Sequence, residues 1–256
     1  QMLSVNNLFS PADGRPIISP TQDMVLGLYY VTKDDGQEPT RTFFGREEVI
    51  IAYGDGQLKL HETIRLRLDR SLWGEDKPSL VIPEDDALAA QIKSKNNVVE
   101  EEAGLRRAQI IETTVGRVLF NEILPKEYGF VNALLDKKKI GAVIADCYKR
   151  FGQDMTVRLL DSLKEFGFIS STQAGISISI TDLTSPLDKE KYIQKAKQEV
   201  GKVEDQYRKG IITGRERYNK IIDIWTHTTE TLSDMVFKRM DAFNPLFIMA
   251  DSGARG

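Results

Sequence analysis

Apolar residues in the C-terminal third of the chain recur at steps of three and four, the spacing that places side chains along one face of a helix. The first series is Ile193, Ala196, Val200, Val203 and Tyr207, and the second is Tyr218, Ile222, Trp225, Thr229, Leu232 and Val236. Gly210 and Gly214 lie between the two series and allow a short turn. Together these features predict an antiparallel coiled-coil hairpin over residues 186–241 that projects from a globular body. Its tip, residues 207–220, concentrates charge.

The first part of the chain combines a helix start with a β-containing region. Thr21 is predicted to cap a helix that opens with the apolar run Met24–Tyr30. Within residues 33–112, an alternating pattern predicts a half-buried strand that includes Leu58, Leu60, Ile64, Leu66 and Leu68. From Trp73 to Glu112 the composition becomes acidic and irregular. We therefore expect residues 33–112 to form a variable excursion from the main fold.

Residues 113–184 have the pattern of a compact helical body. Thr113 and Thr114 can cap a helix that Pro125 ends. Two amphipathic helices are predicted to follow, around Ile140–Phe151 and Met155–Phe166, with Gly167 placed to end the second one. The predicted fold class is therefore α+β, mostly α. Its expected parts are residues 1–32, 33–112, 113–184, 185–242 and 243–256.

The bulk composition excludes some functions and disfavours others. Thirty-five Lys and Arg residues against 38 Asp and Glu give a net charge of −3, which argues mildly against a self-sufficient nucleic-acid binder. A segment of a larger assembly escapes this argument, because its neighbours can supply positive charge. The single cysteine, Cys147, excludes an internal disulfide and a multi-cysteine zinc site, and it is expected to be buried in a protein of the reducing cytoplasm. The sequence contains no run of 18 apolar residues, so we predict no membrane span.

A free-standing hydrolase is also disfavoured. His61 and His227 have no partner at the spacing of a metal site or a catalytic triad, so both are expected to be structural or exposed. The Gly54-Asp55-Gly56 segment is expected to be only a turn. We predict no catalytic residue and no metal ligand in this chain. Both of its ends have the look of cuts through a longer chain.

Several ordered motifs resemble the largest (β′) subunit of bacterial-type RNA polymerases. They are Met2–Pro11, Pro20–Tyr30, Thr113–Arg117 with Leu124-Pro125, Gly214–Trp225 and Met249–Gly256. The resemblance spans the whole chain, and residues 33–112 depart from it where members of the family vary in length. A coiled-coil adaptor that binds partners away from any active site is the alternative, but it leaves the motifs at both ends unexplained.

The resemblance implies a part of the polymerase that does not itself catalyse. In the family, the catalytic Mg²⁺ is held by three aspartates of an Asn-Ala-Asp-Phe-Asp-Gly-Asp motif, which is expected upstream of Gln1. This chain is expected to form the floor and rim of the secondary channel, through which nucleoside triphosphates enter. The hairpin is similar to the rim helices that dock Gre-type and DksA-type factors. Other implied partners are the α, β, ω and σ subunits, with DNA and RNA bound only by the whole nucleotidyltransferase.

Six residues of this sequence take candidate roles from the resemblance. Arg255 is expected near the triphosphate of the incoming nucleotide, and its alternative role is a structural ion pair with an acidic neighbour such as Asp251. Gln22 and Asp23 are candidates to line the channel, although helix capping is their simpler explanation. For factor docking the candidates are Asn219, Lys220 and Asp223, against the simpler reading of a solvated helix face.

One family feature does not carry over. Some members bind guanosine tetraphosphate through a Lys, Ile, Asp and Tyr set, and the matching positions here are Asp154, Arg158, Asp161 and Glu165. Only the aspartate is retained, so we do not predict that site.

Overall fold

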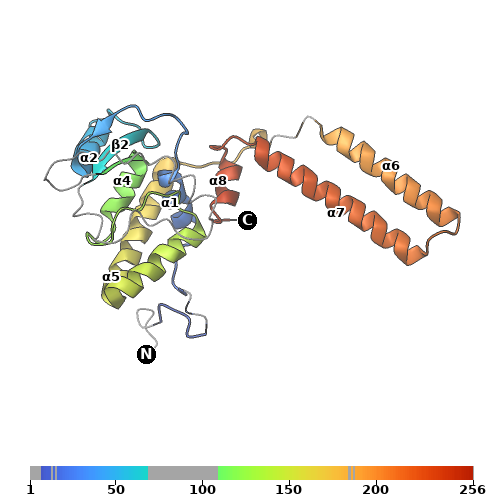
Figure 1. Cartoon of the computed structure of the whole chain (residues 1–256), viewed down its shortest axis with the longest axis horizontal. Coiled ribbons are helices and arrows are strands. Elements are labelled where there is room, and N and C mark those ends of the chain that lie inside the picture. The colour runs from blue at the N-terminus through green and yellow to red at the C-terminus, as the bar shows by residue number, and fades with distance from the viewer. Residues whose placement is uncertain are drawn as a thin grey trace. The chain divides into compact units, whose positions relative to one another are not determined.

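The computed structural model describes residues 7–12, 14, 16–68, 109–183, 186 and 188–255. The chain divides into two compact units, the first comprising Gln1–Ile176 with Met249–Gly256 and the second Ser177–Ile248. Helices dominate, and one small three-stranded mixed sheet accompanies them, which confirms the predicted α+β, mostly α class (Figure 1). The five-part division predicted from sequence stays a prediction. The acidic stretch that begins at Trp73 lies largely outside the described residues, as do residues 2–6 of the first motif.

Helix α1 (Asp23–Thr32) packs against the long helix α5 (Lys137–Ala174) in the main core of the first unit. Because α1 is apolar on most of its surface, seven of its ten residues are buried. The core cluster gathers Val25, Leu28, Phe120, Leu124, Tyr128, Val131, Leu135, Ile140, Val143, Ile144, Cys147, Leu159 and Leu163. Cys147 is fully buried, as the sequence predicted.

Two glycines allow the close approach of α1 and α5. A Cβ atom on Gly27 would lie 2.1 Å from the backbone oxygen of Gly167, and one on Gly167 would lie 2.8 Å from the backbone oxygen of Met24. The prediction that Gly167 ends a helix is therefore wrong, because α5 continues past it to Ala174 and Gly175 adopts the left-handed C-cap conformation. The two helices predicted separately are joined at a kink, where Gly152 has φ 77°.

The mixed sheet supports a second apolar cluster. Strand β2 (Thr63–Leu68) lies between β1 (Thr42–Phe43), which is parallel to it, and β3 (Gln109–Thr114), which is antiparallel. Ile64, Leu66 and Leu68 are buried and alternate with exposed arginines, so this half of the predicted strand is confirmed. Leu58 and Leu60 precede the strand and do not belong to it.

Helices α2 (Arg46–Gly54) and α4 (Val115–Glu122) pack near the sheet. Sequence reasoning missed α2, although the turn it expected at Gly54-Asp55-Gly56 follows directly, with φ 71° at Gly56. The capping prediction for Thr114 is confirmed, because its hydroxyl accepts a hydrogen bond from the backbone amide of Arg117.

The second unit contains the predicted antiparallel helix pair, α6 (Lys189–Arg208) and α7 (Gly214–Arg239), which lie side by side in Figure 1. At 1.5 Å per residue these helices are about 30 and 39 Å long. Gly210, with φ 72°, makes the turn, and Thr213 and Glu216 form a reciprocal capping box at the start of α7. Projection of this pair from the body stays a prediction.

Ion pairs between α6 and α7, or between α7 and the residue before α6, lie at both ends of the hairpin. Near the tip, Arg217 lies 4.0 Å from Glu204 and its guanidinium stacks over the Tyr207 ring at 4.7 Å. At the far end, Arg239 lies 3.6 Å from Asp188. Helix α8 (Pro245–Asp251) follows α7 in the chain. Just before α8, the Asn244 side chain donates a hydrogen bond to the carbonyl of Asp182 in the short 3-10 helix η3 (Ile180–Asp182).

The predicted seam of α7 is wrong by one residue over its first half. The less exposed positions are Arg217, Ile221, Ile224 and Thr228, whereas Tyr218, Ile222 and Trp225 are 63%, 44% and 37% exposed. On α6 the prediction holds for Ala196 and Val203, which are buried, and for Ile193 and Val200, which are half-buried.

Candidate functional site

Arg255 and Asp23 meet although 232 positions separate them in the sequence. A terminal guanidinium nitrogen of Arg255 lies 3.3 Å from a carboxylate oxygen of Asp23 in the first turn of α1. Their side chains are 62% and 52% exposed, so the ion pair is solvated and contributes little stability. The structure thus brings two of the predicted site residues together, and the acidic neighbour of Arg255 is Asp23, where the sequence suggested Asp251.

Gln22 occupies the N-cap position of α1 in a strained conformation. Its φ of 49° and ψ of −120° fall in a backbone region that residues other than glycine rarely adopt, and no side chain makes a capping hydrogen bond there. Thr21 is therefore not the N-cap, and capping by the Gln22 side chain is also ruled out. The backbone carbonyl of Thr21 instead accepts from the amide of Met24 at 3.2 Å. Asp23 suits the positive end of the helix dipole.

The segment from Asp251 to Arg255 is anchored by several contacts within the first unit. The Tyr29 hydroxyl donates to an Asp251 carboxylate oxygen at 2.5 Å, and the Lys137 amide donates to the Ser252 carbonyl at 3.1 Å. Ser252 is fully buried, and Gly253 has φ 67°. Burial raises the pKa of Tyr29, and its hydrogen bond to Asp251 adds to the effect. The tyrosine therefore stays protonated and donates.

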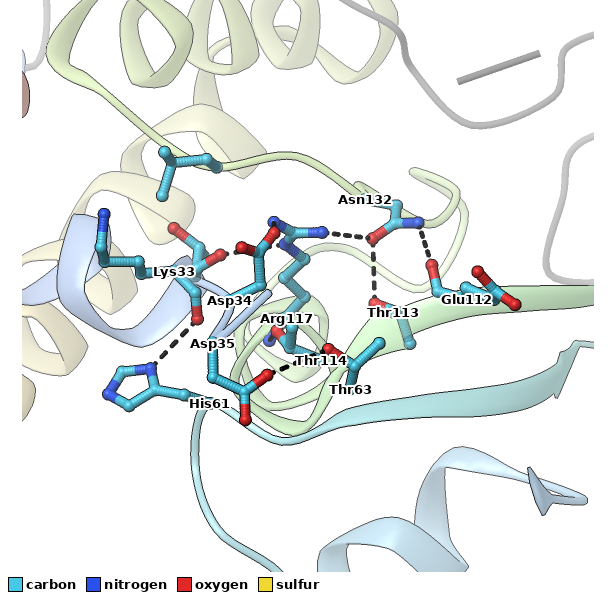
Figure 2. A network of polar contacts seen from close by, with 12 residues as sticks. Lys33, Asp34, Asp35, His61, Thr63, Glu112, Thr113, Thr114, Arg117 and Asn132 are labelled. Atoms are coloured by element: carbon cyan, nitrogen blue, oxygen red, sulfur yellow. Dashed lines mark hydrogen bonds and ion pairs between the residues drawn. The ribbon is translucent and has the colours of Figure 1, made fainter. Parts of the chain in front are cut away.

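The C-terminal end of α1 is held by Arg117, a role that sequence reasoning missed (Figure 2). The Arg117 side chain donates to the carbonyl of Thr32 at 2.9 Å, to the Asn132 side chain at 3.3 Å and to Asp34 at 3.1 Å. Burial lowers the pKa of Arg117 and the Asp34 carboxylate opposes this, so the guanidinium remains charged. The network therefore joins α1, α4 and the loop around Asn132.

Two flanking contacts in Figure 2 extend this network. The Asn132 amide donates to the Glu112 carbonyl at 2.8 Å, and His61 Nδ1 lies 3.0 Å from the Lys33 carbonyl. His61 is half-buried and burial lowers its pKa, which agrees with the structural role expected for it. His227 is exposed on α7.

At the hairpin tip, the predicted docking residues Asn219, Lys220 and Asp223 are all exposed on α7. The tip also exposes the large apolar side chain of Ile211 and that of Tyr218, which sequence reasoning did not assign to the surface. This surface can contact a partner through both charged and apolar groups.

The described residues contain neither a metal-ligand cluster nor a membrane-spanning helix. There, no three His, Cys, Asp or Glu side chains form a group that could hold a metal ion. Within the same ranges, no helix combines the length and apolar character that crossing a bilayer requires.

Comparison with known proteins identifies the chain as a segment of a multisubunit RNA polymerase. The chain belongs to the family described as RNA polymerase Rpb1, domain 3, whose model matches residues 7–183. Over its whole length it is homologous to bacterial β′ subunits. It is 39% identical over 257 residues to DNA-directed RNA polymerase subunit beta' of Pelotomaculum thermopropionicum and 43% identical over 267 residues to that of Methylacidiphilum infernorum. All of this chain is covered, but only 19% and 17% of these relatives, so it spans about a fifth of their length.

Proposed function

We propose that this chain is the part of a β′ subunit that lines the nucleotide-entry channel of a DNA-dependent RNA polymerase, with Arg255 contacting the triphosphate. The observation that carries the proposal is the exposed guanidinium of Arg255 at the N-terminal end of α1, in a chain homologous throughout to β′ subunits. The chain acts with the other polymerase subunits, and DNA and RNA bind to the whole enzyme. The catalytic Mg²⁺ belongs to residues of the full subunit that this chain does not contain.

The Arg255–Asp23 pair suits reversible binding of phosphate. An exposed ion pair is worth about 0–1 kcal/mol, so an incoming triphosphate can replace the Asp23 carboxylate at small cost. The planar guanidinium donates two parallel hydrogen bonds to phosphate oxygens, which favours an arginine over a lysine at this position. Gln22 and Asp23 then line the channel beside the bound nucleotide.

Nucleotide titration of the assembled polymerase tests the role of Arg255. We expect Arg255→Ala to raise the nucleotide KM about tenfold or more, because a hydrogen bond to a charged group is worth about 1.5–3 kcal/mol. Arg65→Ala is the matched control, because Arg65 forms a comparable exposed ion pair with Glu112 at 3.4 Å on the sheet. A KM for Arg255→Ala within twofold of the parent enzyme removes Arg255 from the site.

We also propose that the α6–α7 hairpin is the rim-helix dock for Gre-type and DksA-type factors. The exposure of Asn219, Lys220 and Asp223 on one stretch of α7 supports this, as do the apolar side chains exposed beside them. Charge reversal by Lys220→Glu or Asp223→Lys is expected to weaken factor binding to the assembled enzyme in a titration. Lys238→Glu, an exposed reversal at the other end of α7, is the control. Unchanged affinity for the two tip variants would count against docking.

A further inference from the structure

We propose that Tyr29, Asp251 and Lys33 form a positioning device that fixes the segment carrying Arg255 against α1. This inference rests on the proposed role of Arg255 in binding the triphosphate. Asp251 does not touch the nucleotide in this proposal. It acts through Arg255, four residues further along the chain, and Tyr29 and Lys33 act through Asp251.

Helix α1 contacts the C-terminal segment at two points. Asp23 in its first turn pairs with Arg255, and Tyr29 lies six residues later and bonds Asp251. Six helical residues span about 9 Å. The segment therefore runs opposite to α1 and is held at both ends. The Asp23 contact is exposed and weak, so of these two contacts with α1 the Tyr29 contact is the one that can fix where the segment lies.

The Tyr29 contact has the features of a strong hydrogen bond. The Tyr29 side chain is fully buried, its hydroxyl donates to the Asp251 carboxylate at 2.5 Å, and it accepts from the Lys33 ammonium at 3.3 Å. A hydroxyl that accepts from a cation is polarised and donates more strongly to a carboxylate. Lys33 is itself buried, with its ammonium 5.1 Å from the Tyr29 ring centre. This arrangement cannot shift to follow a displaced Asp251.

The position of α1 is set independently of the C-terminal segment. Arg117 holds the carbonyl of Thr32, the residue directly before Lys33, and the Leu135 amide donates to the Thr32 hydroxyl at 3.0 Å. Helix α1 is thus a fixed platform onto which the segment is bonded. Loss of the Tyr29 bond removes the side-chain anchor at Asp251 and leaves the segment held by its backbone contact at Ser252. The Arg255 guanidinium then samples positions away from the phosphate, which lowers affinity without removing the charge.

A double-mutant cycle in the assembled polymerase tests the proposal. Tyr29→Phe keeps the buried ring and removes only the hydroxyl, so we expect the nucleotide KM to rise about three- to tenfold while kcat changes less than twofold. In an Arg255→Ala background the same change is expected to leave KM within twofold, because the residue it positions is gone. Asp251→Asn retains an acceptor oxygen for Tyr29 and is expected to restore most of the affinity that Asp251→Ala loses.

Tyr30→Phe is the matched control, because it makes the same chemical change one residue away and preserves the ring contact of Tyr30 with His61. A Tyr29→Phe KM within twofold of the parent, with Arg255→Ala still impaired, overturns the positioning device and leaves the proposed function standing. Effects of Tyr29→Phe and Arg255→Ala that add fully also overturn it, because Tyr29 then acts apart from Arg255. If Arg255→Ala itself has no effect, the proposed function fails first. Because Asp251 is exposed, its variants retain a readout if Tyr29→Phe prevents assembly.

Discussion

Gly27→Ala tests the closest helix contact in the first unit. A Cβ atom at Gly27 would lie 2.1 Å from the Gly167 backbone oxygen and 2.8 Å from the Ser171 backbone nitrogen. Ordinary Cβ contacts begin near 3.4 Å, so alanine requires these two groups to move apart by a further 1.3 Å, the difference between 3.4 and 2.1 Å. Backbone atoms cannot rotate aside as the end of a side chain can. Helices α1 and α5 must therefore move apart as rigid bodies.

The cost follows from the side chains that the separation loosens. Val25 and Leu28 of α1 and Leu159 and Leu163 of α5 are buried in one cluster. Each contributes about 2 kcal/mol through burial, and a gap of about 1 Å forfeits a quarter to a half of the dispersion contacts, or about 2–4 kcal/mol in total. Alanine returns about 1 kcal/mol of helix propensity. The expected net loss is therefore about 1–3 kcal/mol.

Amide hydrogen exchange of the full chain, resolved on peptides from α1 and α5, measures the free energy of opening this contact. Gly141→Ala is the matched control in α5, because a Cβ there meets only the Pro16 side chain, at 4.0 Å. It is expected to leave protection unchanged or to add up to about 1 kcal/mol. Gly27→Ala alone is expected to speed exchange in both helices. If the Gly27→Ala peptides exchange as slowly as those of the parent chain, the packing argument is refuted.

The hairpin offers three further tests, each measured by exchange of α7 peptides. Thr213→Ala is expected to cost about 1 kcal/mol by removing the N-cap hydroxyl, whereas Thr226→Ala, on the exposed face within the helix, is expected to cost nothing. Hydrogen bonds from the Thr213 amide and hydroxyl lower the pKa of Glu216. The stability that these hydrogen bonds contribute is therefore complete above the ordinary pKa of 4.5, and it is lost as the pH falls through the lower pKa of the folded chain. The parent chain is therefore expected to lose more protection from exchange in acid than Thr213→Ala does. Ile224→Ala is expected to cost about 1–2 kcal/mol more than Ile222→Ala, and equal costs would contradict the observed seam.

Local signals in the sequence were sufficient for several elements. The alternation at Ile64, Leu66 and Leu68 identified the strand β2. Thr113 and Thr114 were both identified as possible helix caps from their type and position, and Thr114 is the cap. These features depend on residues a few positions apart, so a short window contains them. The prediction for Gly167 was wrong because it used the same short window. A glycine near the end of an apolar run usually ends a helix, whereas the glycine inside α5 is explained only by the close approach of α1.

The candidate site could be predicted only in part. The resemblance to the β′ family named Arg255 and Asp23 separately, but their pairing joins positions 232 residues apart, and no local pattern encodes it. Arg117 shows the same limit, because the three groups that its side chain bonds come from α1 and from two loops. Contacts of this kind depend on how the helices pack, which periodicity does not determine.

The shifted seam of α7 shows what periodicity leaves open and why this matters for function. The helix carries two adjacent stripes with the same spacing, one through Ile221 and Ile224 and the other through Ile222 and Trp225. The period is identical, so the sequence predicts a hairpin but cannot say which stripe faces α6. The hairpin needs only one stripe, and the structure uses the first. The second remains exposed on the same helix as Lys220, so apolar contacts and charge are both available there to the docking partner that we propose.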